Sequence, residues 1–392
     1  MKKYRLFIIF TQYQLINAVN FIANTPKCND HLNDIIVHSG TGAIMPGSYR
    51  DSLGELFENV FEINCCHPEA TVLQQINAAY PAGVRRFLHR VAVRIVASVL
   101  RRLPGSAYLK FSFGPQFDAG RYREVFFYNF PWLVRKIFSA LYHRSHLRTL
   151  HVLEDGTGNY VNQKTEEYFA QKYKDLQIFS HIYAPELIAY SGHPHGELVP
   201  LPRLSGKNPG FLQYLNRLFG YSTDNILNLG IEFVILDQNI QIFFKDKEQR
   251  KKLFDFKTGL YQLAAEAFGS RLWLKVHPAG LTDDSMEKSQ LKNIITAAGA
   301  NRCPFELLLL NAEKYPGLIT IASTACFTPY YAMDREQTDF RLIVLDRLFD
   351  LNKIDDGFLN LDRFIDRLEA KYKFYRPRTR EEYRQILQTL SS

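Results

Sequence analysis

The sequence predicts an α/β protein of two domains, each built on a parallel sheet. Short apolar runs rich in β-branched and aromatic residues alternate with longer helical patterns, which is typical of parallel strands joined by right-handed crossovers. The 392 residues exceed what one ordinary hydrophobic core accommodates. A stretch rich in proline and glycine, Ser191–Gly210, separates two series of such runs, and we therefore interpret it as a linker.

The first domain is expected over residues 1–190. Two lysines near the N-terminus precede an apolar run that turns polar at Thr11, and this run is too short for a signal peptide and lacks a small-residue cleavage site. The expected strands are Tyr4–Phe10, Asp34–His38, Val60–Asn64, Glu124–Tyr128, Thr149–Leu153 and Gln177–Tyr183. The helices expected between them include Gln14–Ala23, Val84–Leu103 and Trp132–His143.

The second domain is expected over residues 225–360, after a linker at 191–224. Its expected strands are Phe233–Asp237, Trp273–His277, Leu318–Ala322 and Leu342–Asp346. Helical patterns cover Lys247–Phe268 and Glu287–Ala298. Residues 361–392 predict C-terminal helices at Leu361–Tyr372 and Arg380–Leu390, the second capped and packed on the outside.

The composition is that of a globular protein, with 46% hydrophobic and 22% charged residues. The five cysteines are too few and too scattered for a disulfide framework, and no Cys/His spacing indicates a zinc site. We therefore expect reduced thiols and a cytoplasmic location. No segment reaches the roughly 18 apolar residues that a membrane-spanning helix needs.

The net charge of +8 is concentrated in one segment. Between Pro81 and Leu150, thirteen basic residues face only two acids, which predicts an anionic partner surface. In Val84–Leu103, basic residues gather near one helical face, so this helix could contact the anionic inner face of a membrane. The alternative is an ordinary solvated helix. A nucleic-acid partner is a further alternative that we do not expect, because the segment has no evident recognition motif.

Two carboxylates and a glycine follow the expected strand Thr149–Leu153. Glu154, Asp155 and Gly156 form a turn at a strand end, where ligands of open α/β sheets bind. A carboxylate in this position is a candidate general base. Ordinary turn chemistry gives the same pattern.

A lysine and a histidine end the strand near residue 275. Strand alternation places Lys275 and His277 on one face, and Pro278 ends the ladder. Both side chains can donate charge-assisted hydrogen bonds to a phosphate. The alternative is a histidine that only bonds the backbone at a strand end.

Two hydroxyls follow a third strand, at Ser323 and Thr324. If a helix begins there, its free N–H groups and the hydroxyls would form an anion site, although an N-cap gives the same pattern. Glu306 lies in the first turn of a helix begun by Pro304. It could accept hydrogen bonds from a ribose, or it could complement the helix dipole.

Together these motifs suit group transfer from a phosphate-linked donor. A base takes the proton of the acceptor, while cations and hydroxyls stabilise the departing phosphate. The sequence has no Gly-x-Gly-x-x-Gly, Walker, Gly-x-Ser-x-Gly or His-Glu-x-x-His motif. We see no well-spaced Asp-x-Asp pair for a metal–diphosphate complex, and a donor with one phosphate would need no metal.

The ordered set of motifs resembles that of bacterial sialyltransferases of the lipooligosaccharide type, glycosyltransferase family 52. The acid-acid-glycine turn, the His-Pro pair and the Ser-Thr pair correspond in order, and Phe305-Glu306 lies between the last two. The segment Thr11-x-x-Gln14-Leu15-x-Asn17-Ala18 is similar to the opening strand and helix of that family. The resemblance runs from Phe10 to about Tyr330.

The resemblance implies a GT-B fold, with two Rossmann-like domains facing across a cleft, and metal-independent, inverting transfer of sialic acid from CMP-sialic acid. It assigns the base to Asp155, with Glu154 as its rival. His277 would hold or protonate the CMP phosphate with help from Lys275, Ser323 and Thr324 would donate to the same phosphate, and Glu306 would bind the cytidine nucleotide. Because some relatives carry a catalytic acid near the first strand of the second domain, Asp237, next to Gln238, is another candidate.

Several alternatives remain open at this level. The donor could be another nucleotide sugar, such as a hexose or Kdo-type donor, since family members differ in the sugar they use. The chain could also be a degenerate member without catalysis. The acceptor is expected to be a glycan or glycolipid of the cell surface, such as lipooligosaccharide or capsule. The sequence fixes neither the linkage nor whether a homodimer forms.

Overall fold

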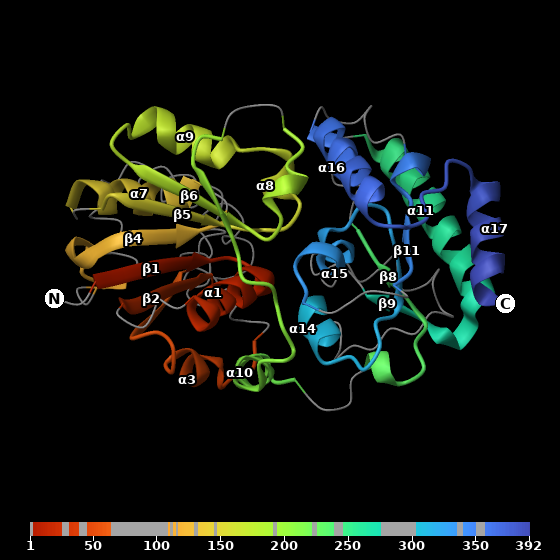
Figure 1. Cartoon of the computed structure of the whole chain (residues 1–392), viewed down its shortest axis with the longest axis horizontal. Coiled ribbons are helices and arrows are strands. Elements are labelled where there is room, and N and C mark those ends of the chain that lie inside the picture. Colours follow the sequence, from red (N-terminus) through yellow and green to blue (C-terminus); the bar gives the residue numbers. More distant parts are fainter. Residues whose placement is uncertain are drawn as a thin grey trace, which may run out of the picture.

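The chain folds into two α/β lobes that lie side by side (Figure 1). The structure is a computed structural model that describes residues 3–25, 31–38, 45–63, 109, 113–114, 117–128, 132–144, 147–190, 194–221, 226–238, 246–275, 303–334, 340–349 and 357–392. Each lobe is built on one sheet whose strands pair in parallel throughout. The α/β class expected from the alternating pattern is confirmed.

The first sheet has the strand order β3-β2-β1-β4-β5-β6-β7 in the described part of the chain. Its strands are β1 (Lys3–Ile9), β2 (His31–His38), β3 (Asn59–Ile63), β4 (Tyr122–Phe127), β5 (Thr149–Leu153), β6 (Gln177–Ile182) and β7 (Glu197–Pro200). The strand order reverses between β1 and β4, which makes this the switch point of a doubly wound sheet. The central strands read as continuous apolar runs because helices cover both faces.

The helices of the first lobe follow its strands. They are α1 (Gln12–Asn24), α3 (Tyr49–Leu53), α7 (Trp132–Arg144), α8 (Gly158–Val161) and α9 (Lys164–Lys172), with short 3₁₀ turns at Ala119–Arg121 and Pro185–Leu187. The predicted strands and the helices near residues 14 and 132 are confirmed to within a few residues. The expected helix Val84–Leu103 lies outside the described residues, as does much of the basic segment Pro81–Leu150.

The segment expected as a linker contributes regular structure. Glu197–Pro200 forms β7, which pairs with β6 at the edge of the first sheet. Proline in the sequence favours a linker, but an edge strand tolerates proline because one side of its ladder is unpaired. The segment then forms α10 (Pro209–Phe219), which begins at the N-cap Asn208 and ends at Gly220 in the left-handed region.

The second sheet has the order β11-β10-β8-β9 among the described residues. Its strands are β8 (Phe233–Leu236), β9 (Leu272–Lys275), β10 (Gly317–Thr320) and β11 (Leu342–Val344). The helices are α11 (Lys247–Phe268), α14 (Phe305–Leu310) and α15 (Thr328–Tyr331), with 3₁₀ turns at Ile226–Asn228, Gly269–Arg271, Thr324–Cys326 and Asp346–Leu348. The expected helix Lys247–Phe268 is confirmed, whereas Glu287–Ala298 lies outside the described residues.

Two helices end the chain, as expected. The first, α16 (Gly357–Lys371), reaches back to the first lobe, where the Asn360 side chain donates to the Val161 carbonyl at 2.9 Å. The second, α17 (Arg380–Ser391), is capped by Thr379, which accepts from the Glu382 N–H, and packs beside α11 at the outer end of the second lobe (Figure 1).

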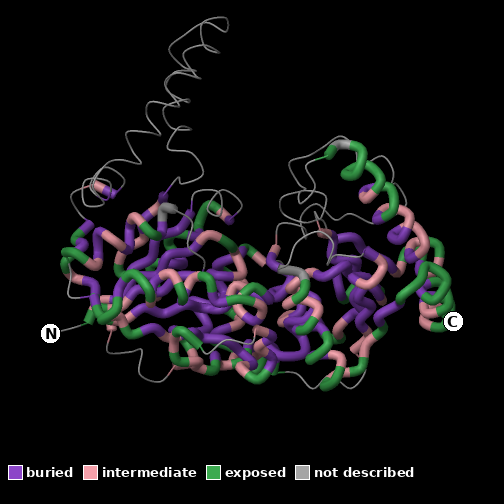
Figure 2. Tube along the Cα trace, turned by 90° about the horizontal axis from the view of Figure 1, so that it is seen from above, coloured by how far each residue is buried: buried purple, intermediate pink, exposed green. Residues whose placement is uncertain are grey.

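The two lobes share buried contacts. One hydrophobic cluster contains residues of both sheets, and buried stretches of the chain run through both lobes (Figure 2). Leu204, after β7, bonds to the backbone of the second lobe in both directions, accepting from Asp334 and donating to Ala332. In the described part of the chain, no helix combines the length and apolar composition needed to cross a bilayer.

Candidate functional site

The acid-glycine turn after β5 lies against the Ser-Thr pair after β10. The hydroxyl oxygens of Thr157 and Thr324 are 3.2 Å apart. Gly156 has φ +85°, and a Cβ at this position would overlap the Thr324 methyl group and lie 3.0 Å from its Cβ. Two reasons therefore favour glycine at this position: its positive φ and the close approach of Thr324. Two motifs that the sequence places far apart meet between the lobes.

Glu154 is fully buried within this turn. Its carboxylate accepts hydrogen bonds from the Tyr13 hydroxyl at 3.0 Å, the Tyr160 hydroxyl at 2.5 Å and the Tyr183 N–H at 3.1 Å. Burial raises the pKa of Glu154 to about 7, although these donors oppose the shift. Because its oxygens are already occupied by protein donors, Glu154 holds the turn in place and is a poor base for an external hydroxyl.

Asp155 lies at the surface of the same turn and is only partly buried. Its backbone N–H donates to the Asn159 side chain at 2.7 Å, and this bond helps to fix the turn. Of the two acids, Asp155 is the one in contact with solvent. This geometry favours Asp155 over Glu154 as the acid that meets a substrate.

Asn17 on α1 and Tyr183, which directly follows β6, support the turn. The Asn17 side chain donates to the Glu154 carbonyl at 2.9 Å and accepts from the Tyr183 hydroxyl at 2.5 Å. The ring of Tyr160 meets the ring of Tyr331 in the second lobe edge to face, with the ring centres 5.1 Å apart. The asparagine was visible in the opening motif, but tyrosines give no periodic signal that separates a site from a core.

Thr11 and Gln14 serve the start of α1. The Thr11 hydroxyl accepts from the Gln14 N–H at 3.2 Å, and the Gln14 side chain accepts from the Phe10 N–H at 2.7 Å. The pair resembles a capping box, except that the Gln14 side chain accepts from the residue before the N-cap and not from the N-cap itself. Their place in the opening motif is therefore explained by helix initiation.

Lys275 and Glu306 lie close enough to each other to interact electrostatically. The Lys275 ammonium donates to the Cys303 carbonyl at 2.9 Å and so ties β9 to the segment that begins α14. Burial lowers the pKa of Lys275 to about 8 and raises the pKa of Glu306, against the attraction of Lys275. His277 and Pro278 lie outside the described residues.

Asp237 is engaged in a buried ion pair. Its carboxylate accepts from the Lys257 ammonium at 2.8 Å and the Tyr261 hydroxyl at 3.1 Å, both on α11, and only 7% of the residue is exposed. The Gln238 side chain accepts from the Ala322 N–H at 2.7 Å and joins the ends of β8 and β10. Both residues thus stabilise the fold of the second lobe, and the ion pair disfavours Asp237 as a base.

The Ser-Thr pair does not open a long helix. Ser323 precedes a three-residue 3₁₀ turn, its hydroxyl caps nothing, and its N–H is held by the Thr320 hydroxyl at 3.0 Å. A second short helix, α15, follows. The expected helix-dipole contribution to an anion site is therefore small, because a dipole of this kind needs several aligned peptide units.

No protein-family model matches the sequence, and no curated protein matches it. Among solved structures, the chain is similar to UGT89C1 of Arabidopsis thaliana complexed with quercetin, at 12% identity and TM-score 0.45 over 100% of this chain and 90% of that one. It is also similar to the E. coli heptosyltransferase WaaC, at 14% identity and TM-score 0.37 over 86% and 88%. A third similar structure is a putative UDP-N-acetylglucosamine 2-epimerase from Listeria monocytogenes, at 12% identity and TM-score 0.43 over 99% of this chain and 91% of that one.

The class of protein is set by the chain's own architecture. Two lobes with parallel sheets meet where strands end, and the C-terminal helix α16 returns to the first lobe. This is the GT-B arrangement that the motif resemblance implies. An architecture does not specify a reaction. The reaction has to be argued from the residues between the lobes.

Proposed function

We propose that this protein is a glycosyltransferase that binds a nucleotide sugar between its two lobes. The observation that carries the proposal is the contact of the acid-glycine turn with Thr324, because it brings a carboxylate-bearing turn and a hydroxyl-bearing turn to one place. Both turns follow the carboxyl ends of parallel strands, where α/β proteins bind their ligands.

The donor we propose is CMP-sialic acid, on the strength of the motif resemblance. Asp155 would remove the proton of the acceptor hydroxyl, whose oxygen forms a bond to the anomeric carbon while the bond from that carbon to the phosphate oxygen breaks. Inversion follows from attack opposite the leaving group. CMP departs with the bonding electron pair, and Ser323, Thr324 and His277 would donate to its phosphate.

Glu154 and Lys275 would support this site without contacting the substrate. Glu154 would hold the turn that presents Asp155, and Lys275 would hold the segment that carries Glu306, the proposed partner of the nucleotide. The acceptor we propose is a terminal sugar of a surface glycan or glycolipid.

Nucleotide binding tests the donor assignment. A ligand that binds only the folded state raises the melting temperature, so CMP should raise it while UDP and GDP at equal concentration should not. Stabilisation by UDP or GDP instead would identify another nucleotide sugar as the donor. The proposal would be refuted if none of these nucleotides raises the melting temperature and no transfer from CMP-sialic acid is detected.

Substitution of the proposed base tests the mechanism. Asp155→Asn should lower kcat by about 10²-fold to 10⁴-fold, the range for loss of a general base, with CMP binding retained. Asp175→Asn is the matched control, because Asp175 is an exposed aspartate that contacts Tyr142 and Arg148 away from this turn. Equal activity of the Asp155 variant and the control would exclude Asp155 as the base.

A further inference from the structure

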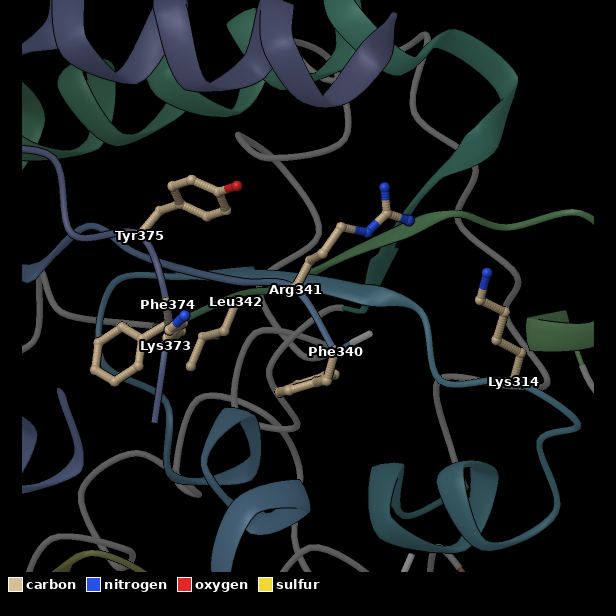
Figure 3. A pocket seen from close by; sticks show the side chains of 7 residues that line it. All are labelled: Lys314, Phe340, Arg341, Leu342, Lys373, Phe374 and Tyr375. Atoms are coloured by element: carbon tan, nitrogen blue, oxygen red, sulfur yellow. The ribbon is translucent and has the colours of Figure 1, made fainter. Parts of the chain in front are cut away.

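A cavity lies at the end of the C-terminal sheet opposite to the candidate site. It has a volume of about 620 Å³ and is lined by residues before β10, residues that enter β11, and the segment that follows α16 (Figure 3). Lys314 precedes β10, and Arg341 directly precedes β11. Ser323 and Thr324 follow β10 at its other end, so the cavity is separate from the candidate site.

Three cations line this cavity, and no acidic side chain does: Lys314, Arg341 and Lys373. Among the described residues, none of the three forms an ion pair. Lys314 and Lys373 are exposed. Arg341 is held by stacking, with its guanidinium carbon 4.7 Å from the centre of the Phe233 ring. Stacking leaves the edge N–H groups of a guanidinium able to donate.

The other walls of the cavity are aromatic and apolar. Phe340 and Phe374 both pack on Tyr330, with ring centres 5.0 and 6.2 Å from it. Tyr375 bonds to the β11 backbone, donating to Leu342 and accepting from Val344. Its side chain is 39% exposed and extends to the same side of β11 as Arg341 (Figure 3). The cavity thus combines cations that pair with no acid in the described part of the chain with aromatic residues on both sides of β11 (Figure 3).

We propose that this cavity binds an acidic sugar, carboxylated or phosphorylated, as a ligand distinct from the nucleotide donor. The cations would hold the anionic group, for which a guanidinium is well suited, and the aromatic walls would contact the apolar faces of the ring. Anion binding follows from the lining residues alone, whereas the choice of a sugar rests on the proposed function. The ligand could be a free monosaccharide or one unit of a longer acidic glycan.

Binding titrations by calorimetry on the full chain test this proposal. The probes are N-acetylneuraminic acid, its linear trimer, glucose 1-phosphate, neutral glucose and inorganic phosphate. We expect saturable binding of the acidic sugars and not of glucose, with Lys373→Glu weakening it about tenfold, which corresponds to about 1.4 kcal/mol. Tighter binding of the trimer than of the monosaccharide would indicate a longer glycan, and equal affinity would indicate a free sugar.

Matched variants locate the binding. Lys252→Glu makes the same charge change on α11, where Lys252 is exposed and pairs with Glu248, and it should leave the affinity unchanged. Thr324→Ala should also leave it unchanged, since Thr324 belongs to the candidate site between the lobes. Circular dichroism checks that each variant is folded, and the exposed position of Lys373 makes its substitution tolerable.

Several results would overturn the proposal. They are no saturable binding of any acidic sugar, equal binding of glucose, equal affinity for inorganic phosphate and glucose 1-phosphate, or equal loss in the Lys252 and Lys373 variants. Transfer from CMP-sialic acid without sugar binding in this cavity would refute this inference alone. Sugar binding without any transferase activity would refute the proposed function and leave anion recognition at the cavity intact.

Discussion

Replacement of Gly156 by alanine should destabilise the protein by a mechanism that the contact with Thr324 specifies. The residue has φ +85°, a conformation that costs an L-residue with a side chain about 1–2 kcal/mol. The new Cβ would overlap the Thr324 methyl group, and forced overpacking costs about 1–3 kcal/mol. We therefore expect Gly156→Ala to lower the free energy of unfolding by about 2–5 kcal/mol.

Urea unfolding followed by fluorescence measures this loss, provided that the slope with denaturant stays constant between variants. Gly158→Ala is the matched control two residues away. A Cβ at Gly158 would have no atom within 4 Å and its φ is not positive, so this variant should be neutral or slightly more stable, by up to about 1 kcal/mol because alanine favours the helix.

A double-mutant cycle isolates the clash from the backbone strain. Thr324→Ser removes the methyl group but keeps the hydroxyl, so the cost of Gly156→Ala should be smaller in this background by about 1 kcal/mol or more. The strain would remain. Equal costs of Gly156→Ala in both backgrounds, or a cost no larger than that of Gly158→Ala, would refute the packing of these two turns against each other.

Other expectations follow from buried charge. Arg376 is buried among four carboxylates, so Arg376→Leu should lower the free energy of unfolding by about 3–5 kcal/mol, whereas Arg384→Leu, which breaks an exposed pair, should lower it by at most about 1 kcal/mol in the same urea assay. Burial lowers the pKa of His181 to about 3, well below its unfolded value of about 6.5. The unfolded state therefore binds more protons between these two pH values, and the free energy of unfolding falls as the pH drops below about 6.5. His181→Gln should remove up to about 2 kcal/mol of this loss between about pH 7 and pH 5, and an identical pH dependence of variant and wild type would contradict the expectation. Glu154→Gln places an amide against hydrogen-bond donors and should cost about 1–3 kcal/mol of unfolding free energy, while a fully stable variant would contradict the hydrogen-bond geometry at Glu154.

The local elements were readable from the sequence because their signals are local. The helix Lys247–Phe268 and the strand Thr149–Leu153 were predicted with the bounds that the structure gives them. Apolar periodicity and flanking breakers act within one or two turns of the chain, and the same holds for the cap at Thr379. The edge strand β7 was missed because prolines look alike in a linker and at a sheet edge.

The composition of the site was decided by tertiary contacts. The motif resemblance assigned the base to Asp155 and left Glu154 as its rival. Packing separates the two acids, since three protein donors surround Glu154 and none of these bonds is visible from spacing. Likewise, Asp237 was a candidate catalytic acid because it lies at a strand end. In the fold its carboxylate accepts a hydrogen bond from Lys257, twenty residues later in the chain.

The alternation of strands and helices, the two-lobe division and the residue types at each strand end are properties of the sequence by itself, because they depend on neighbours within a few residues. Which strand ends face each other is a property of the fold, because the Thr157–Thr324 contact spans 167 positions and no local pattern records it. Burial likewise depends on what packs from elsewhere in the chain. It decides whether a carboxylate meets solvent or is enclosed by the hydroxyls of Tyr13 and Tyr160.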